Sequence, residues 1–267
     1  MVIRYHVRTN CTGSTHIMAE RLKYSPLIEA LCEFRFAPSQ TWDWTIPGRL
    51  YDEIGKEFSE RAQVDAIGVE LLLAPNKVTA PQVIRGPSPE RVQLKRPDGT
   101  AMVQVGPHLL VVNHLRPYSD WASFRPMILD AYTKHEKITG PAKVARIGLR
   151  YINQIPLPER DCELEEITTL PQKLPGALQK PLANIYQRFE LEQEQPKAIL
   201  VVQAGIQRTE QQNFLILDFD IGTHPKLEIA GVAGVLAWLD EAHDRIDEAF
   251  LAAVNPALIE KWKRGGP

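Results

Sequence analysis

The chain has 267 residues, of which 44% are hydrophobic and 24% are charged, a composition typical of a folded globular protein. Its 31 Lys and Arg residues against 33 Asp and Glu residues leave a formal charge of −2, which argues against a large phosphate-binding surface and disfavours nucleic acid as a partner. No window approaches the roughly 18 apolar residues of a membrane span, and the first residues lack the apolar core of a signal peptide. The sequence therefore predicts a cytoplasmic protein with no membrane partner.

Known chemical motifs are missing from the sequence. Cys11, Cys32 and Cys162 lie far apart and form no CxxC pair, so we expect reduced thiols and no thiolate metal site. The phosphate loops GxGxxG and GxxxxGK do not occur, nor do the catalytic patterns GxSxG and HExxH. From motifs alone we predict no cofactor, no metal ligand and no catalytic residue.

The first elements are predicted from periodicity. Residues 1–22 show neither a helical nor a strand period and are rich in Thr, Asn, Gly and Ser, so we expect a mobile N-terminal extension. In LIEALCEFRF, residues 27–36, apolar and charged residues alternate as in a half-buried strand. Thr45 is then predicted to cap a helix in which apolar residues recur every four positions, at Ile46, Leu50, Ile54 and Phe58.

The middle of the chain predicts more strands and a second helix. The expected strands lie at 64–73, 81–86, 91–96 and 101–115, the last with a break at Gly106-Pro107. A helix is predicted over 121–138, with Ser119 or Asp120 as its cap. Pro126 fits this helix only if regular turns begin near Phe124, because an interior proline costs about 3 kcal/mol.

The second half repeats this plan. We expect a strand at 144–155, a short acidic helix near 163–170, strands near 184–194, 197–207 and 213–221, and a long helix over 235–254. The order strand, helix, strands, helix therefore occurs twice, over 23–140 and over 141–267. It predicts an α+β fold in which two similar halves surround one antiparallel sheet with the helices on one face. The plan resembles TATA-box-binding-protein-like and helix-grip-like duplications, and this likeness of fold implies no function by itself.

Five phrases carry a further likeness: SPLIEALCEFRF, VNHLRPYSDWASF, RIGLRYINQI, LDFD and WLDEAHDRIDEAF. Together they resemble a sporadically distributed family of bacterial and archaeal proteins of about this length, over nearly the whole chain. The patchy occurrence implies a mobile-element, phage-defence or toxin–antitoxin context. The family has no established activity, so the resemblance implies no chemistry. It does place several residues in family motifs: Trp121, Arg150, Asn153, Asp220, Trp238 and His243.

Charged residues occupy one face of three predicted strands whose other positions are apolar. Strand by strand, they are Glu29, Glu33 and Arg35; Arg146 and Arg150; and Asp218 and Asp220. If the three faces coincide, one surface carries several carboxylates and guanidinium groups. This surface is either a solvated face with cross-strand ion pairs or a polar groove that grips a charged ligand.

We expect a non-enzymatic binding or regulatory protein that meets another protein or a small charged ligand on this face. The candidate contact residues are Glu33, Arg146, Arg150, Asn153, Asp218 and Asp220. The alternative is a metal-dependent phosphohydrolase of the triphosphate-tunnel kind, in which the acids hold Mg²⁺ or Mn²⁺ and the arginines hold phosphates. Leu31, however, interrupts the Glu-x-Glu-x-Lys pattern of those enzymes.

Histidines and aromatic pairs allow two interpretations each. His243 lies between Asp240 and Asp247 at helical spacing, which suits either a metal or acid–base role or a half-buried structural histidine. His114 is expected to fix a turn. The aromatic pairs either stack a ligand or fill the space between helices and sheet; they are Trp42 with Trp44 and Trp121 with Tyr118.

Overall fold

The computed structural model describes residues 22–37, 42–70, 73–74, 77–78, 82–141, 143–158, 163–171, 175–178, 184–225, 227, 229 and 231–266. For residues 65–70, 73–74, 77–78 and 82–89 only the backbone is described. The N-terminal extension predicted over 1–22 therefore lies, apart from Leu22, outside the described residues. Cys11 and Cys162 lie outside them as well.

One antiparallel sheet of nine strands forms the centre of the described chain. Its strands are β1 (Leu27–Phe36), β2 (Glu60–Glu70), β5 (Gln82–Lys95), β6 (Ala101–Gly106), β7 (Leu109–Leu115), β8 (Val144–Pro156), β9 (Tyr186–Glu194), β10 (Lys197–Arg208) and β11 (Asn213–Thr223). The pair β3 (Leu73–Ala74) and β4 (Lys77–Val78) forms a separate small sheet. The prediction of an α+β fold with an antiparallel sheet is confirmed.

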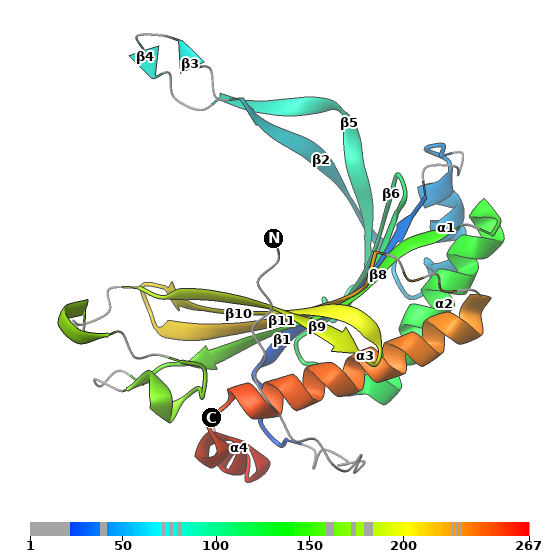
Figure 1. Cartoon of the computed structure of the whole chain (residues 1–267). Helices are drawn as coiled ribbons and strands as arrows, with labels where there is room; N and C mark the ends of the chain where they lie inside the picture. The colour runs from blue at the N-terminus through cyan, green and yellow to red at the C-terminus, as the bar shows by residue number, and fades with distance from the viewer. Residues whose placement is uncertain are drawn as a thin grey trace.

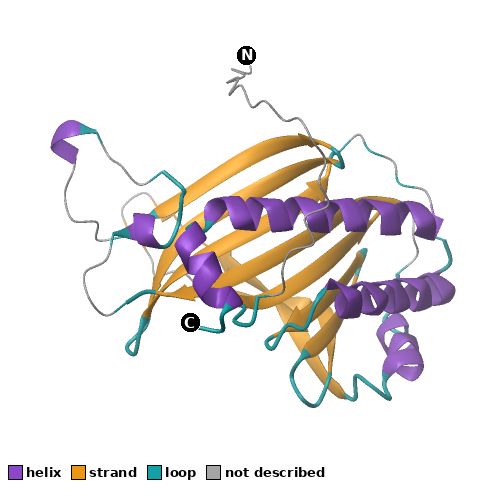
Figure 2. Cartoon of the chain, turned by 90° about the horizontal axis from the view of Figure 1, so that it is seen from below, coloured by secondary structure: helices purple, strands orange, loops and turns teal. Residues whose placement is uncertain are grey.

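Helices alternate with these groups of strands. The α-helices are α1 (Ile46–Ile54), α2 (Trp121–Thr139), α3 (Gly231–Ala253) and α4 (Pro256–Lys263), and two single 3₁₀ turns are η1 (Leu164–Glu166) and η2 (Gly176–Leu178). Seen from below, α2 and α3 lie in front of the strands on the same face of the sheet, and α1 lies beside α2 (Figure 2). No described helix is long and apolar enough to cross a membrane.

The strand order is β2-β5-β6-β7-β1-β8-β11-β10-β9. The strands β1 and β8 therefore lie side by side at the middle, and the predicted boundary at 140/141 falls in the connection that leads from α2 to β8. The sheet is strongly bent, so that β2 and β5 rise away from β10 and β11 on the side opposite the helices (Figure 1). This bend leaves a concave face that no described helix covers, and we call it the concave face.

The helix-covered face holds the core. In β1, Ala30, Cys32, Phe34 and Phe36 are buried at alternate positions, as the sequence predicted. Leu149 of β8 and Phe219 of β11 continue the same layer in the neighbouring strands. The apolar stripes of α2 and α3 pack on this layer. Burial of their apolar surface stabilises the fold by about 25 cal/mol for each Å² removed from water.

Several predicted boundaries are wrong for identifiable reasons. The strands expected at 81–86 and 91–96 form the single strand β5, which pairs with β6 only over Val92–Lys95. Pro87 and Pro89 therefore lie in the part of β5 that has no partner strand on the β6 side. On that side no backbone N–H group is needed for pairing, so the two prolines do not end the strand. The acidic helix expected at 163–170 is only the single turn η1. The predicted break at Gly106-Pro107 is confirmed by the end of β6 and the start of β7.

Helix caps differ in part from the predictions. Asp120 caps α2 by accepting a hydrogen bond from the Ser123 amide at 2.9 Å. The helix starts at Trp121 rather than near Phe124, so Pro126 does lie inside it. Pro126 and Ala122 are both exposed, so water can replace the missing donor at the Ala122 carbonyl. Thr45 stands before α1, but its side chain makes no capping hydrogen bond.

The fourth helix was not predicted. Asn255 caps α4 by accepting a hydrogen bond from the Ala257 amide at 2.9 Å, and Pro256 occupies the first turn. The helix buries Ile259 and Trp262. The Trp262 carbonyl also accepts hydrogen bonds from the Lys23 and Tyr24 amides, both at 3.1 Å. The last helix therefore holds the beginning of the described chain.

His135 makes the stability of this core depend on pH. The ring is 2% exposed and stacks on Phe36 with centroids 4.8 Å apart, and burial lowers the pKa of His135 to about 4, from an ordinary value of 6.5. As the pH falls, His135 therefore binds a proton in the unfolded chain before it does so in the folded protein. The contribution of neutral His135 to the free energy of unfolding is complete above pH 6.5 and is lost as the pH falls towards 4.

We expect His135→Phe to weaken this dependence. Between pH 7 and pH 4.5 the wild type should lose about 2–3 kcal/mol more stability than the variant, measured by urea unfolding at each pH. The comparison isolates His135, because carboxyl groups titrate in both proteins. Parallel pH profiles for the two proteins would contradict the assignment of a neutral buried His135.

Candidate functional site

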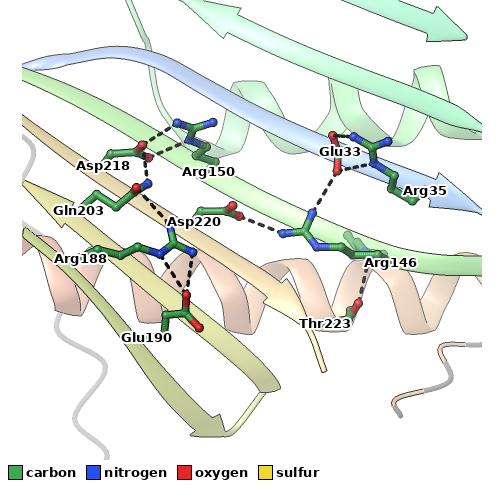
Figure 3. A network of polar contacts seen from close by, with 11 residues as sticks. Glu33, Arg35, Arg146, Arg150, Arg188, Glu190, Gln203, Asp218, Asp220 and Thr223 are labelled. Atoms are coloured by element: carbon green, nitrogen blue, oxygen red, sulfur yellow. Dashed lines mark hydrogen bonds and ion pairs between the residues drawn. The ribbon is translucent and has the colours of Figure 1, made fainter. Parts of the chain in front are cut away.

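The strand register brings the predicted charged faces together on the concave face. Arg35 lies opposite Arg146, Glu33 opposite Gly148, and Asp220 opposite Arg150. Figure 3 shows the charged side chains on the side of the sheet turned away from the helices. All the candidate contact residues except Asn153 lie on this surface. We call these residues, together with the residues that bond to them, the charged network.

Arg146 links three strands of the charged network. Its Nη1 lies 3.1 Å from Glu33 Oε1 and its Nη2 lies 3.2 Å from Asp220 Oδ1. Glu33 also accepts two hydrogen bonds from Arg35, both at 2.9 Å. The result is a chain of alternating charges that runs from β1 across β8 to β11. Such alternation allows four ionised groups to lie close together without net repulsion.

Two glycines make room for Arg146. Gly148 and Gly222 lie opposite each other in β8 and β11, and the guanidinium group lies over both. A Cβ atom at Gly222 would stand 2.6 Å from Arg146 Nη2, and one at Gly148 would overlap Nη1. Both positions therefore require glycine if Arg146 is to reach Glu33 and Asp220.

Arg150 forms the most buried ion pair of the site. Its Nε and Nη2 donate to the two carboxylate oxygens of Asp218 at 2.8 and 2.6 Å, a bidentate geometry that is stronger than a single contact. The hydrogen bond to Asp218 raises the pKa of Arg150. The Asp218 side chain is 9% exposed and the Arg150 side chain 39%, so the guanidinium group supplies hydrogen bonds that water cannot supply to this buried carboxyl group.

The network continues to the edge of the sheet through residues that were not predicted. Gln203 donates to Asp218 at 3.2 Å and accepts from Arg188 at 3.0 Å. Arg188 also pairs with Glu190 at 2.8 Å (Figure 3). The sequence did contain a pattern that could have indicated Arg188 and Glu190. Because side chains alternate along a strand, one face of β9 carries Tyr186, Arg188, Glu190 and Glu192.

Asp220 is less fully bonded than Asp218. Burial raises the pKa of Asp220, and the nearby Arg146 and Arg150 oppose that rise. Within the described residues Asp220 accepts one hydrogen bond, at 3.2 Å, whereas Asp218 accepts three. Asp220 therefore has acceptor capacity left for a donor group on a partner.

A row of amides carries the polar surface into the first half. Gln93 donates to Gln104 at 3.1 Å, Gln104 to Asn113 at 2.9 Å, and Asn113 to Glu29 at 2.6 Å. The row crosses β5, β6, β7 and β1, and its middle members are buried. The two buried amides, Gln104 and Asn113, each donate to one neighbour and accept from another, so the row satisfies its buried members.

Asn153 does not join this surface. It shares the odd-numbered face of β8 with Leu149 and Tyr151, which is the face that the helices cover, and it is buried. Its Nδ2 donates to the Leu217 carbonyl at 3.3 Å. The expectation that Asn153 shares a face with Arg146 and Arg150 does not hold, because alternation along β8 places it on the opposite side of the sheet.

His243 also lies on the helix side. Its Nδ1 is 3.0 Å from the Tyr151 hydroxyl, its Nε2 is 3.6 Å from Asp247, and its ring stacks on Trp121. Asp240 is instead held by Arg125 at 2.6 and 2.8 Å. Burial raises the pKa of Tyr151, so this hydroxyl stays neutral. The arrangement ties α3 to the sheet, as expected of a half-buried structural histidine.

The aromatic pairs lie away from the concave face. Tyr118 and Trp121 contact Phe124 in the layer between α2 and the sheet. Trp42 and Trp44 meet edge to face at 5.5 Å just before α1. His114 contacts Ser119 at 3.3 Å across the turn that leads to α2, in agreement with the turn role expected of it.

Fold and site together define an α+β protein whose bent antiparallel sheet is covered by helices on one face and carries ion pairs on the other. No protein-family model matches the chain, and no curated protein is found that is similar to it.

Proposed function

We propose that the chain is a non-enzymatic binding or regulatory protein that recognises a polypeptide partner on its concave face. The single observation that carries the proposal is the charged network itself. Four arginines and four carboxylates from the strands β1, β8, β11 and β9 lie on a face that no described helix covers: Arg35, Arg146, Arg150 and Arg188 with Glu33, Glu190, Asp218 and Asp220.

The balance of charge supports a polypeptide over other partners. Nucleic acid binds through basic groups that are free to neutralise phosphates, whereas each of these arginines already faces a carboxylate. A surface with both signs suits a partner with both signs, such as a protein. A small ligand would favour an enclosed cavity. A hollow of about 310 Å³ among the described residues lies elsewhere, between the β9–β10 turn and α3.

The geometry gives less support to a metal-dependent phosphohydrolase. Divalent ions need several carboxylates that converge on one point. Here Glu33, Asp218 and Asp220 are held by arginines and Glu29 by Asn113. Across the described residues, no three His, Cys, Asp or Glu side chains are placed to share a metal ion.

We also propose that the two halves arose by duplication of a unit like that of the TATA-box-binding protein. The strand order supports this. Outward from β1 the neighbours are β7, β6, β5 and β2, and outward from β8 they are β11, β10 and β9. In both halves the first strand is central, the last strand lies beside it, and a long helix follows. Membership of the sporadic family, with its mobile-element, defence or toxin–antitoxin context, stays a prediction.

The test uses a glycine that positions Arg146. Gly222→Ala places a methyl group where the guanidinium lies, and we expect it to displace Arg146 and to reduce capture of the partner from extracts of the native host at least tenfold. The matched control is Gly205→Ala, on the same face of β10, where a Cβ atom meets nothing closer than 3.5 Å. Both variants should fold, because the displaced group is the end of a flexible side chain.

Mass spectrometry of the captured proteins gives the measurement. The partner should be retained by Gly205→Ala, lost by Gly222→Ala and by Arg146→Met, and weakened by added salt. If Gly222→Ala and Arg146→Met, folded as the control is, both retain every protein that the wild type captures, the concave face is not the binding surface.

A further inference from the structure

Among the described strands, β9 is the outermost at its end of the sheet and has a partner strand on one side only. It is the last strand in the order and pairs with β10 at every one of its positions without a bulge. The described large hydrophobic residues that are exposed include Tyr186, at 68%, and Leu191, at 45%, and both lie on this strand. A regular, partly apolar edge of this kind is a template for another strand.

The register shows which backbone groups face outward. The Ile206 amide donates to the Ile185 carbonyl at 3.3 Å, in continuation of the β9–β10 register. Hydrogen-bonded pairs alternate along an antiparallel ladder, so the odd-numbered residues of β9 face β10. The backbone groups of Arg188, Glu190 and Glu192 therefore face away from the sheet and are available to another strand.

We propose that β9 pairs antiparallel with β9 of a second copy of this chain, in the register centred on Phe189. In that register Arg188 lies opposite Glu190 of the second copy, and Glu190 opposite its Arg188. On the other face Phe189 meets Phe189, a position in which side chains of an antiparallel pair come closest. In this register the residues whose backbone groups face away from β10 lie opposite each other. Their N–H and C=O groups can therefore form hydrogen bonds between the two copies.

The charges select this register over its neighbours. A shift that centres the pair on Arg188 places two arginines opposite each other, and one that centres it on Glu190 places two glutamates opposite each other. Centring on Leu191 opposes Glu190 to Glu192. Like charges directly opposite are destabilising. Among the registers that overlap over most of β9, the one centred on Phe189 opposes only unlike charges.

The pairing would join two sheets edge to edge. The two-fold axis runs perpendicular to the sheet, so both concave faces open to the same side of the dimer. A single pair of strands forms a small interface, so we expect a reversible dimer with a Kd on the order of micromolar. This inference shares Arg188 and Glu190 with the charged network, but its test measures self-association and not capture of the polypeptide partner, so the failure of one proposal is distinguishable from the failure of the other.

Charge reversal tests the register. Arg188→Glu and Glu190→Arg each place like charges opposite each other, so each variant alone should dimerise at least tenfold more weakly than the wild type. An equimolar mixture of the two variants restores unlike pairs in a heterodimer and should regain the wild-type affinity. Both side chains are well exposed, so the reversals leave the core intact, and urea unfolding confirms this.

Sedimentation velocity from about 1 to about 200 µM measures the association. Dimerisation of the wild type and of the mixture, with weak association of each single variant, supports the pairing. A wild type that stays monomeric over this range overturns it, as do single variants that dimerise like the wild type. A mixture that fails to associate when both variants are folded overturns the register centred on Phe189.

Discussion

Replacing Trp262 with alanine is expected to lower the free energy of unfolding by about 4 kcal/mol, the largest single effect that we predict. Trp262 is fully buried on α4 and stacks on Phe250 with centroids 6.2 Å apart, with Tyr24 at 6.0 Å. Its removal leaves a large cavity between α4, α3 and the start of the described chain, which the neighbours fill only in part.

Urea unfolding at pH 7 gives the measurement. The conservative variant Trp262→Phe should lose about 1–2 kcal/mol, because it keeps part of the apolar contact and a ring against Phe250. The predicted order is therefore wild type, then Trp262→Phe, then Trp262→Ala. A loss below about 1 kcal/mol for the alanine variant would show that α4 does not pack on the rest of the protein.

The second large effect concerns Arg150. We expect Arg150→Ala to destabilise the protein by about 3 kcal/mol, because it leaves the Asp218 carboxylate buried without its bidentate partner. The value is at the low end for a buried pair because the Arg150 side chain is 39% exposed. Gln203 alone cannot replace the lost charge.

The double variant Arg150→Met/Asp218→Leu is the control. It removes both charges and keeps apolar volume, so we expect it to recover most of the lost stability in the same unfolding experiment. It should nevertheless fail to bind the polypeptide partner, since it deletes the centre of the charged network. Equal stability of Arg150→Ala and the wild type would contradict the buried ion pair.

The prediction of individual strands succeeded where one face is apolar and the other charged. β1 was predicted to its end residues because Ala30, Cys32 and Phe34 alternate with Glu29, Glu33 and Arg35. The same reasoning found both arginines of β8 and both aspartates of β11. That these faces coincide was only an expectation, since strand order and register depend on pairing between distant segments, and the structure supplies both.

Other features depend on tertiary contacts that periodicity does not show. α4 has only eight residues, too few to be stable by itself, and it forms because Ile259 and Trp262 are buried against the rest of the protein. The part that Arg188 and Gln203 play in the charged network cannot be predicted from their own strands, because it depends on the position of Asp218 beside them. Gly148 and Gly222 look unremarkable in the sequence, and their role appears only with the position of Arg146 above them.

The central claim is that the partner binds the concave face, and photo-crosslinking in cells of the native host tests it most directly. A photoreactive residue in place of Val201, which lies opposite Asp220 on β10, should form an adduct with the partner. The same residue in place of the exposed Asp244 on α3 should form none. An adduct from position 244 with none from position 201 would contradict the account.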